Sequence, residues 1–252
     1  MNEIVVIDVN KVGNRNPSHT PNFVLVGEHS PPILVEAGSN PLGILQEKGF
    51  EDNEIEDVVL THFHPDQVNA IPNIFMHLWL NGRQESMRFY GLNHCIKRVQ
   101  DLLDAHGWVD WPNFFPVGFL MVHDRDDAPV LENQDYIIRA FPLEHSVPNI
   151  GLRIFNKHRG TTLSYISGTH PCENAIITAQ DSDMLIYEIS PQIKGHSTAS
   201  QAGQVATEAD VKMLYINPWN MWRYDRDELY AEAHEHYQGT IRFLEDFESI
   251  QF

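Results

Sequence analysis

The sequence is short of cysteine and has no long apolar run. Its 252 residues include two cysteines, Cys95 and Cys172, which lie far apart and in no spacing typical of a metal site. We therefore expect no disulfide framework and a reducing, cytoplasmic location. No apolar run approaches the roughly 20 residues that a membrane-spanning helix needs, and the acidic start MNEIVVIDVN is not typical of a signal peptide. The sequence thus predicts a protein without a membrane partner.

Basic residues are also scarce, and this bears on the choice of partner. Lys and Arg number 17 against 35 Asp and Glu, which gives a formal net charge of −18. Proteins that bind long nucleic acids draw most of their affinity from Lys and Arg side chains that neutralise phosphates. The densest basic segment is KHRG at 157–160. A long RNA or DNA partner is therefore disfavoured, whereas a small anionic substrate held by a metal is compatible with the composition.

No repeat, low-complexity segment or linker divides the chain, so we expect a single domain over residues 1–252. Apolar segments predict strands at 4–9, 22–26, 33–36, 57–61, 87–91, 136–142, 151–156, 162–167, 184–189 and 213–217, with one or two more near the end of the chain. Helices are expected at 44–48, 70–80, 92–106, 200–209 and 227–237. This pattern favours two packed sheets flanked by helices over a parallel doubly wound sheet.

The segment THFHPDQ, residues 61–67, is the first candidate site. His62 and His64 follow the apolar run VVL and stand two residues apart, so in an extended backbone their rings point to the same side. Neutral imidazoles on one side can converge on a single cation, and Asp66 continues the pattern. The alternative is a polar turn in which Asp66 caps the next helix. Gln67, which ends the segment, is a poor metal ligand.

Later segments also place polar side chains where predicted strands end. These side chains are His145 in LEHSVPN, Thr169 and His170 in SGTHP, Glu188 in LIYEIS, His196 in GHSTAS and Asn217 in YINPWN. A rigid sheet that presents loops at one edge is the usual platform for a functional site. A lone histidine is usually structural, so His145 gains weight only by association with the first segment. Glu188 and His196 also have a non-catalytic interpretation. Glu188 would then be a carboxylate in water at the end of a strand, and His196 would be a neighbour of a helix N-cap.

In this order, the segments resemble those of the metallo-β-lactamase superfamily, and within it the ribonuclease Z-like phosphodiesterases. The similar segments are HSVPNIGLRI, YISGTHPCEN, LIYEIS with HSTASQAG, LWLNGRQESMRFYGL at 78–92 and the closing RFLEDFESIQF. The resemblance spans nearly the whole chain. It implies an α/β fold of layered type, the αββα sandwich, with metals bound at one edge of the two sheets.

The resemblance also implies which side chains hold a first metal. The family pattern is His-x-His-x-Asp-His, followed by a His, a bridging Asp and a last His. Mapped onto this chain, His62, His64 and His145 supply the three histidines of the first metal. Three imidazoles with an open fourth position form a known catalytic zinc arrangement. His170 is a candidate fourth ligand, and its binding would close the site and indicate a structural metal.

The positions that depart from the family pattern all belong to the second metal or to the bridge. Asp66 is kept, but Gln67 and Asn217 stand where the family has histidines, and Thr169 stands where it has the bridging aspartate. Neutral amide and hydroxyl groups are weak metal ligands. We therefore expect one divalent metal, with zinc favoured, and a second metal weakly bound or absent.

Further roles follow from the same resemblance. His196 matches the residue that helps to protonate the leaving group, Glu188 matches the carboxylate that orients it, and Asp66 could orient or deprotonate the attacking water. A carboxylate–imidazole pair is suited to act as a general acid near neutral pH. These three side chains are the expected catalytic residues.

Three functions are compatible with these observations. The first is a mono-metal hydrolase of a small phosphodiester. The sequences LRI at 152–154 and YIS at 165–167 lie close together, whereas ribonuclease Z enzymes carry a long tRNA-gripping arm at about this place. The second is a non-catalytic binding or scaffold protein that has lost the dinuclear centre. The third is a lactone or thioester hydrolase on the same fold. The family often forms homodimers, so the resemblance also implies a homodimer.

Overall fold

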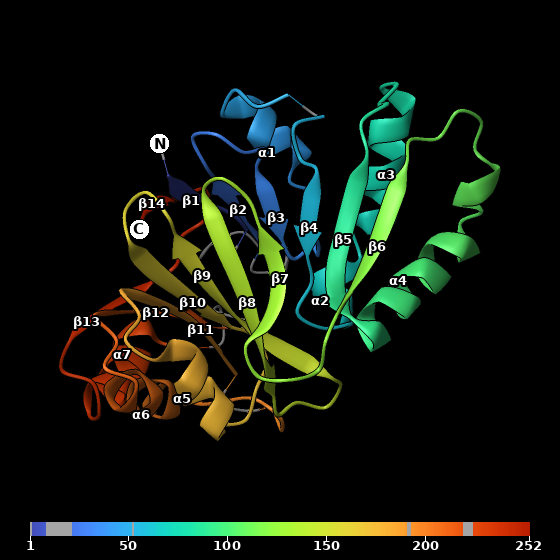
Figure 1. Cartoon of the computed structure of the whole chain (residues 1–252). Helices are drawn as coiled ribbons and strands as arrows, with labels where there is room; N and C mark the ends of the chain where they lie inside the picture. Colours follow the sequence, from blue (N-terminus) through green and yellow to red (C-terminus); the bar gives the residue numbers. More distant parts are fainter. Residues whose placement is uncertain (1, 9–21, 52, 191–192, 219–223) are drawn as a thin grey trace.

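Two mixed β-sheets face each other at the centre of the molecule (Figure 1). The structure is a computed structural model and describes residues 2–8, 22–51, 53–190, 193–218 and 224–252. Each sheet has seven strands within these residues. The two-sheet arrangement expected from the short, dominant strands is therefore confirmed.

The first sheet has the strand order β14-β1-β2-β3-β4-β5-β6. Its strands are β1 (Glu3–Asp8), β2 (Asn22–Val26), β3 (Ile33–Val35), β4 (Asp57–Val59), β5 (Met87–Leu92), β6 (Val117–Val122) and β14 (Ser249–Gln251). Strands β3 to β6 run parallel, whereas β14, β1, β2 and β3 pair in antiparallel fashion. The predicted strand 4–9 extends one residue past the described segment 2–8.

The second sheet has the order β13-β12-β11-β10-β9-β8-β7. Its strands are β7 (Ala128–Glu132), β8 (Tyr136–Leu143), β9 (Asn149–Asn156), β10 (Thr161–Ile166), β11 (Met184–Ile189), β12 (Met213–Pro218) and β13 (Thr240–Phe243). Strands β10 to β13 run parallel, and β7 to β10 pair in antiparallel fashion. A short turn over residues 157–160 joins β9 directly to β10.

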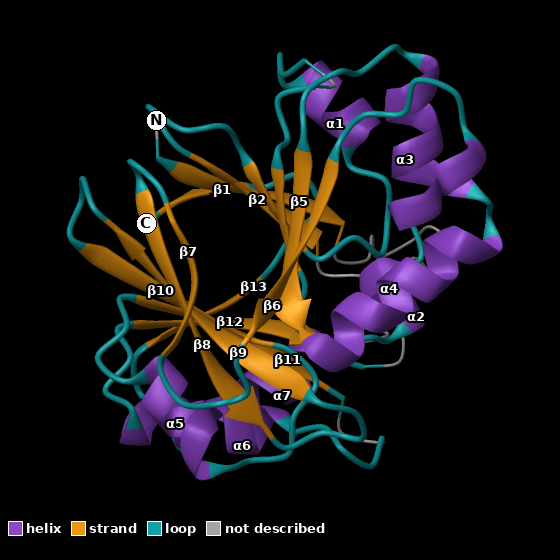
Figure 2. Ribbon diagram, turned by 45° about the vertical axis from the view of Figure 1, so that its right-hand side comes forward, coloured by secondary structure: helices purple, strands orange, loops and turns teal. Residues whose placement is uncertain are grey.

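Helices cover the outer face of each sheet (Figure 2). The first sheet carries α1 (Leu42–Glu47), α2 (Pro65–Val68), α3 (Ile71–Leu80) and α4 (Asn93–Ala105), and the second carries α5 (Glu173–Ala179), α6 (Ala199–Glu208) and α7 (Arg226–His234). This is the αββα sandwich expected for a metallo-β-lactamase fold. None of the helices in the described segments is both long and apolar enough to cross a bilayer.

Apolar side chains fill the space between the sheets and the space under each helical layer. Phe23 of β2 and Tyr165 of β10 meet edge to face across the two sheets, with ring centroids 5.1 Å apart. Full burial of such a side chain contributes roughly 1.5–3 kcal/mol. The aromatic stretch 106–116, with the short helix η1 (Trp108–Asp110), packs on the outer cluster of the first sheet, where Trp108 and Phe114 contact Phe75. This ordered aromatic loop stabilises the sheet edge.

Some elements differ from the sequence prediction for identifiable reasons. The sequence prediction lacks strand β6, because two exposed apolar residues in succession, Leu120 and Met121, break the alternating pattern. It also lacks strand β7, which contains Pro129; the proline is tolerated because β7 lies at the sheet edge. Helix α6 begins at Ala199, one residue before the predicted start, with Thr198 as its N-cap residue in a capping box with Gln201.

One edge of the sandwich collects the ends of strands from both sheets. The carboxyl ends of β3 and β4 in the first sheet lie at this edge, as do those of β8, β10, β11 and β12 in the second. Every polar side chain singled out in the sequence follows one of these strands or stands near its last residue. The topology thus gathers these residues at a single edge.

Candidate metal centre

Three histidine rings converge at this edge. His62 follows β4, His64 is the N-cap residue of α2, and His145 follows β8. Nδ1 of His64 lies 3.1 Å from Nε2 of His62 and 3.2 Å from Nε2 of His145. These nitrogens form a group that could hold a metal ion. We call these residues the three-histidine cluster; its rings come from both sheets.

The spacing within the three-histidine cluster fits a single zinc ion. In a tetrahedral site with Zn–N distances of about 2.0–2.1 Å, neighbouring ligands stand about 3.3 Å apart. The two separations of 3.1 and 3.2 Å are close to that value. The residues present therefore fit a mononuclear site with three protein ligands.

Hydrogen bonds behind two of the rings, His145 and His62, fix which ring nitrogen can bind a metal. Nδ1 of His145 lies 3.0 Å from the carbonyl oxygen of Gly195, so Nδ1 carries the proton and Nε2 keeps its lone pair. The Thr61 hydroxyl donates to Glu36, and its oxygen lies 2.9 Å from Nδ1 of His62. That oxygen can accept the Nδ1 proton, which again leaves Nε2 free to coordinate. Such bonds orient metal-binding imidazoles and raise their basicity.

Burial favours the neutral form of two of the rings. The pKa of His62 lies well below its ordinary value, first because the ring is buried and then because His145 and His64 stand beside it. Burial also lowers the pKa of His145, although its bond to Gly195 acts in the opposite direction. A neutral imidazole is the form that binds a metal.

Asp66 and His170 do not belong to the three-histidine cluster. Asp66 is the second residue of α2, and its charge raises the pKa of both Glu36 and Glu188, so it stands close to these two carboxyl groups. His170 is exposed to solvent. The N-cap of α2 is His64, and the alternative reading of Asp66 as the N-cap is therefore wrong.

The three altered positions offer weak or occupied groups. The Thr169 hydroxyl donates towards the carbonyl oxygens of Glu144 and His170, at 3.0 and 2.7 Å. The Gln67 side chain is buried, and its Oε1 accepts no hydrogen bond from the described part of the chain. Asn217 is buried, and its backbone lies opposite that of Glu188 on the neighbouring strand. None of these groups is an anionic or imidazole ligand.

His196 and Glu188 lie beside the three-histidine cluster. The His196 ring packs edge to face on His145, with centroids 5.0 Å apart. Its Nε2 is 3.7 Å from Oε1 of Glu188, which exceeds a hydrogen-bond distance. Burial raises the pKa of Glu188 to about 8 and lowers that of His196 to about 4. In this structure the carboxylate–imidazole pair expected from the sequence is therefore uncharged near pH 7.

Two site residues were not identified from the sequence. Glu36 follows β3, is fully buried and has a positive φ of 62°. Gly168 has a φ of 47°, and a Cβ at this position would lie 3.1 Å from Nε2 of His145. Glu36 ends the predicted strand 33–36, and its place directly after the apolar run ILV is the signal that could have identified it. Gly168 lies in the segment SGTH, where nothing in the sequence marks a glycine that must pack against His145.

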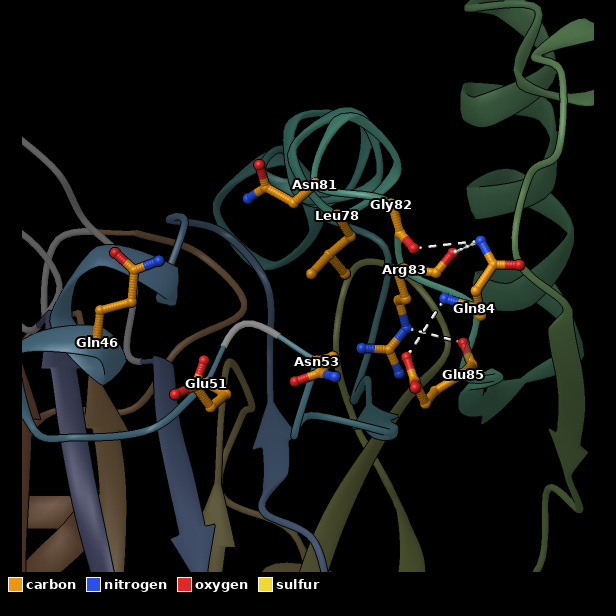
Figure 3. A pocket seen from close by; sticks show the side chains of 9 residues that line it. All are labelled: Gln46, Glu51, Asn53, Leu78, Asn81, Gly82, Arg83, Gln84 and Glu85. Atoms are coloured by element: carbon orange, nitrogen blue, oxygen red, sulfur yellow. Dashed lines mark hydrogen bonds between the residues drawn. The ribbon is translucent and has the colours of Figure 1, made fainter.

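A separate pocket of about 460 Å³ lies away from the three-histidine cluster, between the ends of α1 and α3 (Figure 3). Its buried Arg83 donates to the backbone carbonyls of Ile55, Glu85 and Ser86. Glu51 and Glu85 also line the pocket, and their charge opposes an anionic ligand. Arg83 thus joins backbone segments, and the candidate chemistry stays at the three-histidine cluster.

The two facing sheets, their helical layers and the histidines at one edge define a metallo-β-lactamase-type domain. The beta-lactamase superfamily domain matches residues 33–217, and the chain belongs to that superfamily. The ribonuclease Z of Thermococcus onnurineus (strain NA1) is 23% identical over 274 residues, which cover 87% of this chain and 85% of that protein. The chain therefore lies in the ribonuclease Z-like branch, as its motifs indicate.

Solved structures agree on the fold. The metallo-β-lactamase fold protein YhfI from Bacillus subtilis superposes with a TM-score of 0.78 and 19% identity, covering 98% of each chain. The short form of human tRNase Z superposes with a TM-score of 0.73 and 16% identity, covering 99% of this chain and 98% of that one. The chain thus shares the fold of a hydrolase family and has a histidine cluster that could bind a metal.

Proposed function

We propose that this protein is a mono-metal phosphodiesterase that acts on a small anionic phosphodiester. The observation that carries the proposal is the complete three-histidine cluster beside His196, with neutral side chains at the second-metal positions Gln67 and Asn217. A divalent ion, with zinc favoured, supplies Lewis acidity and lowers the pKa of a water molecule. Relatedness to ribonuclease Z supports phosphodiester chemistry.

The chain's own residues have distinct parts in this proposal. Asp66 orients the attacking water or removes its proton, and His196 protonates the leaving oxygen. The pKa of His196 is held at about 4 by burial. An anionic phosphate beside the ring favours its protonated form and raises this pKa. Glu188 lies 3.7 Å from Nε2 of His196 and stabilises the protonated ring once Glu188 itself is ionised.

Charge and topology support a small substrate rather than tRNA. The formal net charge of −18 repels a polyanion. Residues 157–160 join β9 directly to β10, so this connection has no room for a tRNA-gripping arm. A short phosphodiester needs fewer phosphate contacts, and a bound cation can supply them.

Hydrolysis assays on metal-loaded protein test the proposal. We expect turnover of a chromogenic phosphodiester or a cyclic nucleotide by the wild type. His62→Ala should abolish it through loss of metal, and His196→Ala should lower kcat by about 10²–10⁴-fold with metal content unchanged. His106→Ala, an exposed histidine on another surface, is the matched control. Turnover of lactones or thioesters but of no phosphodiester would contradict the proposed substrate class.

A second candidate is a binding or scaffold protein that uses the region of the three-histidine cluster without catalysis. The altered positions Gln67, Thr169 and Asn217 favour it, because all three fall on the side of the second metal. This candidate requires that His62→Ala leave the biological activity unchanged. A large loss in that variant would exclude it.

A further inference from the structure

A second group of metal-ligating side chains lies at the opposite edge of the sandwich. His29 stands in the connection between β2 and β3, Asp135 directly precedes β8, and His158 lies in the turn between β9 and β10. Strand β8 runs from this edge to the edge that carries His145. Its eight residues, at about 3.3 Å each, separate the two groups by roughly 25 Å.

The three side chains of this group converge on one point. Nδ1 of His29 lies 3.3 Å, and Nε2 of His158 3.0 Å, from the same carboxylate oxygen, Oδ1 of Asp135. All three ligand atoms lie within 4.8 Å of one another. The two rings stack with centroids 4.9 Å apart and an interplanar angle of 25°. These separations are again close to the ligand spacing of about 3.3 Å in a tetrahedral zinc site.

Hydrogen bonding alone explains this arrangement poorly. Oδ1 of Asp135 already accepts a hydrogen bond from the backbone N–H of Glu28 at 3.1 Å. With His29 and His158, three nitrogens crowd one oxygen that has two lone pairs. A cation between the carboxylate and the two rings relieves this crowding, because each imidazole then directs a lone pair, not a proton, to the centre.

The Asp135 carboxylate is built into the fold. Its side chain has no exposed surface, and its Oδ2 accepts from the backbone N–H of His29 at 3.1 Å. A Cβ on Gly27 would lie 2.3 Å from Oδ2, so only glycine lets the loop approach. Burial by itself raises the pKa of Asp135, but hydrogen bonds from Ser30, His29 and Glu28 hold it at about 2. The group is therefore an anion at any physiological pH.

Solvent reaches the two rings from outside. The side chains of His29 and His158 are 52% and 40% exposed, above the fully buried carboxylate. Two surface hollows, of about 500 and 490 Å³, are both lined by His29, Ser30 and Pro31. An ion can therefore enter, and water can occupy a remaining coordination position.

We propose that His29, Asp135 and His158 form a second, structural binding site for a divalent transition ion of the zinc type. Two imidazoles and one carboxylate are a ligand set that suits zinc. The bound ion would tie the β2–β3 connection of the first sheet to two turns of the second. This far-edge site shares no residue with the three-histidine cluster and does not depend on the proposed function.

Zinc stoichiometry tests this site directly. Chelator-stripped full-length protein is reloaded with Zn²⁺, freed of excess ion and analysed for metal. We expect about one zinc fewer per chain in His29→Gln/His158→Gln than in the wild type, and at least a tenfold weaker Zn²⁺ affinity at this site. His62→Ala/His145→Ala should lose the other zinc, and His106→Ala should lose none. Glutamine can still donate to Asp135, so the variant keeps the hydrogen bonds but not the ligands.

A measurement on the unmodified chain covers the case in which the double variant fails to fold. We expect Zn²⁺ to protect His29 and His158 from modification by diethyl pyrocarbonate, as mapped by mass spectrometry, whereas His106 stays reactive. Unchanged zinc content in a folded His29→Gln/His158→Gln protein, or equal labelling with and without Zn²⁺, would overturn the inference. Loss of zinc only from the three-histidine cluster variant would overturn it as well and would leave the proposed function standing.

Discussion

At the residue scale, the histidines of the candidate metal centre are held by groups behind them. The carbonyl oxygen of Gly195 accepts a hydrogen bond from His145. The hydroxyl of Thr61, which itself donates to Glu36, accepts one from His62. Each bond leaves one ring nitrogen aimed at the shared centre. Neutral, pre-oriented imidazoles are the state that a metal requires, so the site is prepared before an ion arrives.

Thr61→Val should weaken metal binding while it keeps the shape of the side chain. The substitution removes the hydroxyl that accepts from Nδ1 of His62, so the ring loses its fixed tautomer. We expect zinc affinity at the three-histidine cluster to fall by about 10–100-fold, as measured by competition with a chromogenic chelator. Thr207→Val, at the far end of α6, is the control. Equal affinities in both variants would show that the hydroxyl has no orienting role.

Gly168→Ala should disturb the same site from its other side. The new Cβ would lie 3.1 Å from Nε2 of His145, at a φ of 47°. Gly107→Ala meets a similar positive φ of 66° but has no atom within 4 Å of its Cβ. Both variants should lose about 1 kcal/mol to backbone strain. Only Gly168→Ala should also lose zinc affinity, and a parallel loss in both would contradict the contact with His145.

Glu188→Gln should change how the stability of metal-free protein depends on pH. Burial raises the pKa of Glu188 to about 8, so the folded state binds this proton more tightly than the unfolded state. Its contribution is present below the unfolded pKa and is lost as pH rises towards 8, by at most about 1.4 kcal/mol per pH unit. Glutamine mimics the protonated acid and can still accept from Ser167.

Urea unfolding at pH 5 and pH 8, with a chelator present, measures this effect. The variant should match the wild type at pH 5 and exceed it at pH 8. His196, with a pKa of about 4, is largely neutral at both pH values, and groups distant from Glu188 titrate alike in both proteins, so the difference reports Glu188. An equal pH dependence of stability in both proteins would show that the pKa of Glu188 is not raised, and would contradict its burial.

At the element scale, close packing of α6 on α7 supports the edge that carries His196. Gly203 of α6 faces the backbone of α7, where a Cβ would lie 2.4 Å from the carbonyl oxygen of Ala233. The contact holds the start of α6 in place, close to the loop that carries His196. The packing of α6 on α7 thus helps to position the loop that carries His196.

Gly203→Ala should therefore destabilise the protein although alanine is the better helix former. Alanine gains up to about 1 kcal/mol from helix propensity, but the overlap forces the helices apart and costs about 1–3 kcal/mol. Gly43→Ala in α1, with no atom within 4 Å, should stabilise instead. Thermal unfolding of the two variants checks the opposite signs, and a Gly203→Ala variant as stable as the wild type would show that α6 and α7 can move apart freely.

Elements with a strong local pattern were predictable from the sequence. Strand β11 was predicted with its observed bounds, because all of its residues except Glu188 are apolar and both of its faces are buried. Helices α2 and α5 were missed, because they have four and seven residues and contacts outside the helix stabilise them. The resemblance to a known family supplied the layer order, which periodicity alone leaves open.

At the scale of the whole molecule, the sequence indicated which side chains gather at one edge but not how they meet. The spacing of His62 and His64 after a predicted strand indicated a metal site, and the resemblance to a known family added His145 to it. The roles of Glu36 and Gly168 depend on contacts between segments far apart in the chain, and spacing along a sequence cannot supply such distances. The far-edge group could not be predicted from the sequence for the same reason, since His29, Asp135 and His158 come from three separate turns.

The sandwich therefore has side chains that could hold a metal at both of its edges. Zinc bound at the proposed mononuclear centre must be measured separately from zinc bound at the proposed far-edge site. The His29→Gln/His158→Gln background removes the far-edge ligands and leaves the three-histidine cluster intact. Restoring the three altered positions together, as Gln67→His, Thr169→Asp and Asn217→His, should raise the zinc content of that background towards two per chain.

Zinc content per chain in the His29→Gln/His158→Gln background tests the central claim most directly. The account predicts one zinc per chain, none after the further substitution His145→Ala, and no second zinc at moderate excess of the ion. A folded protein of this background that holds no zinc, or one that holds two without the restoring substitutions, would contradict a mononuclear three-histidine centre.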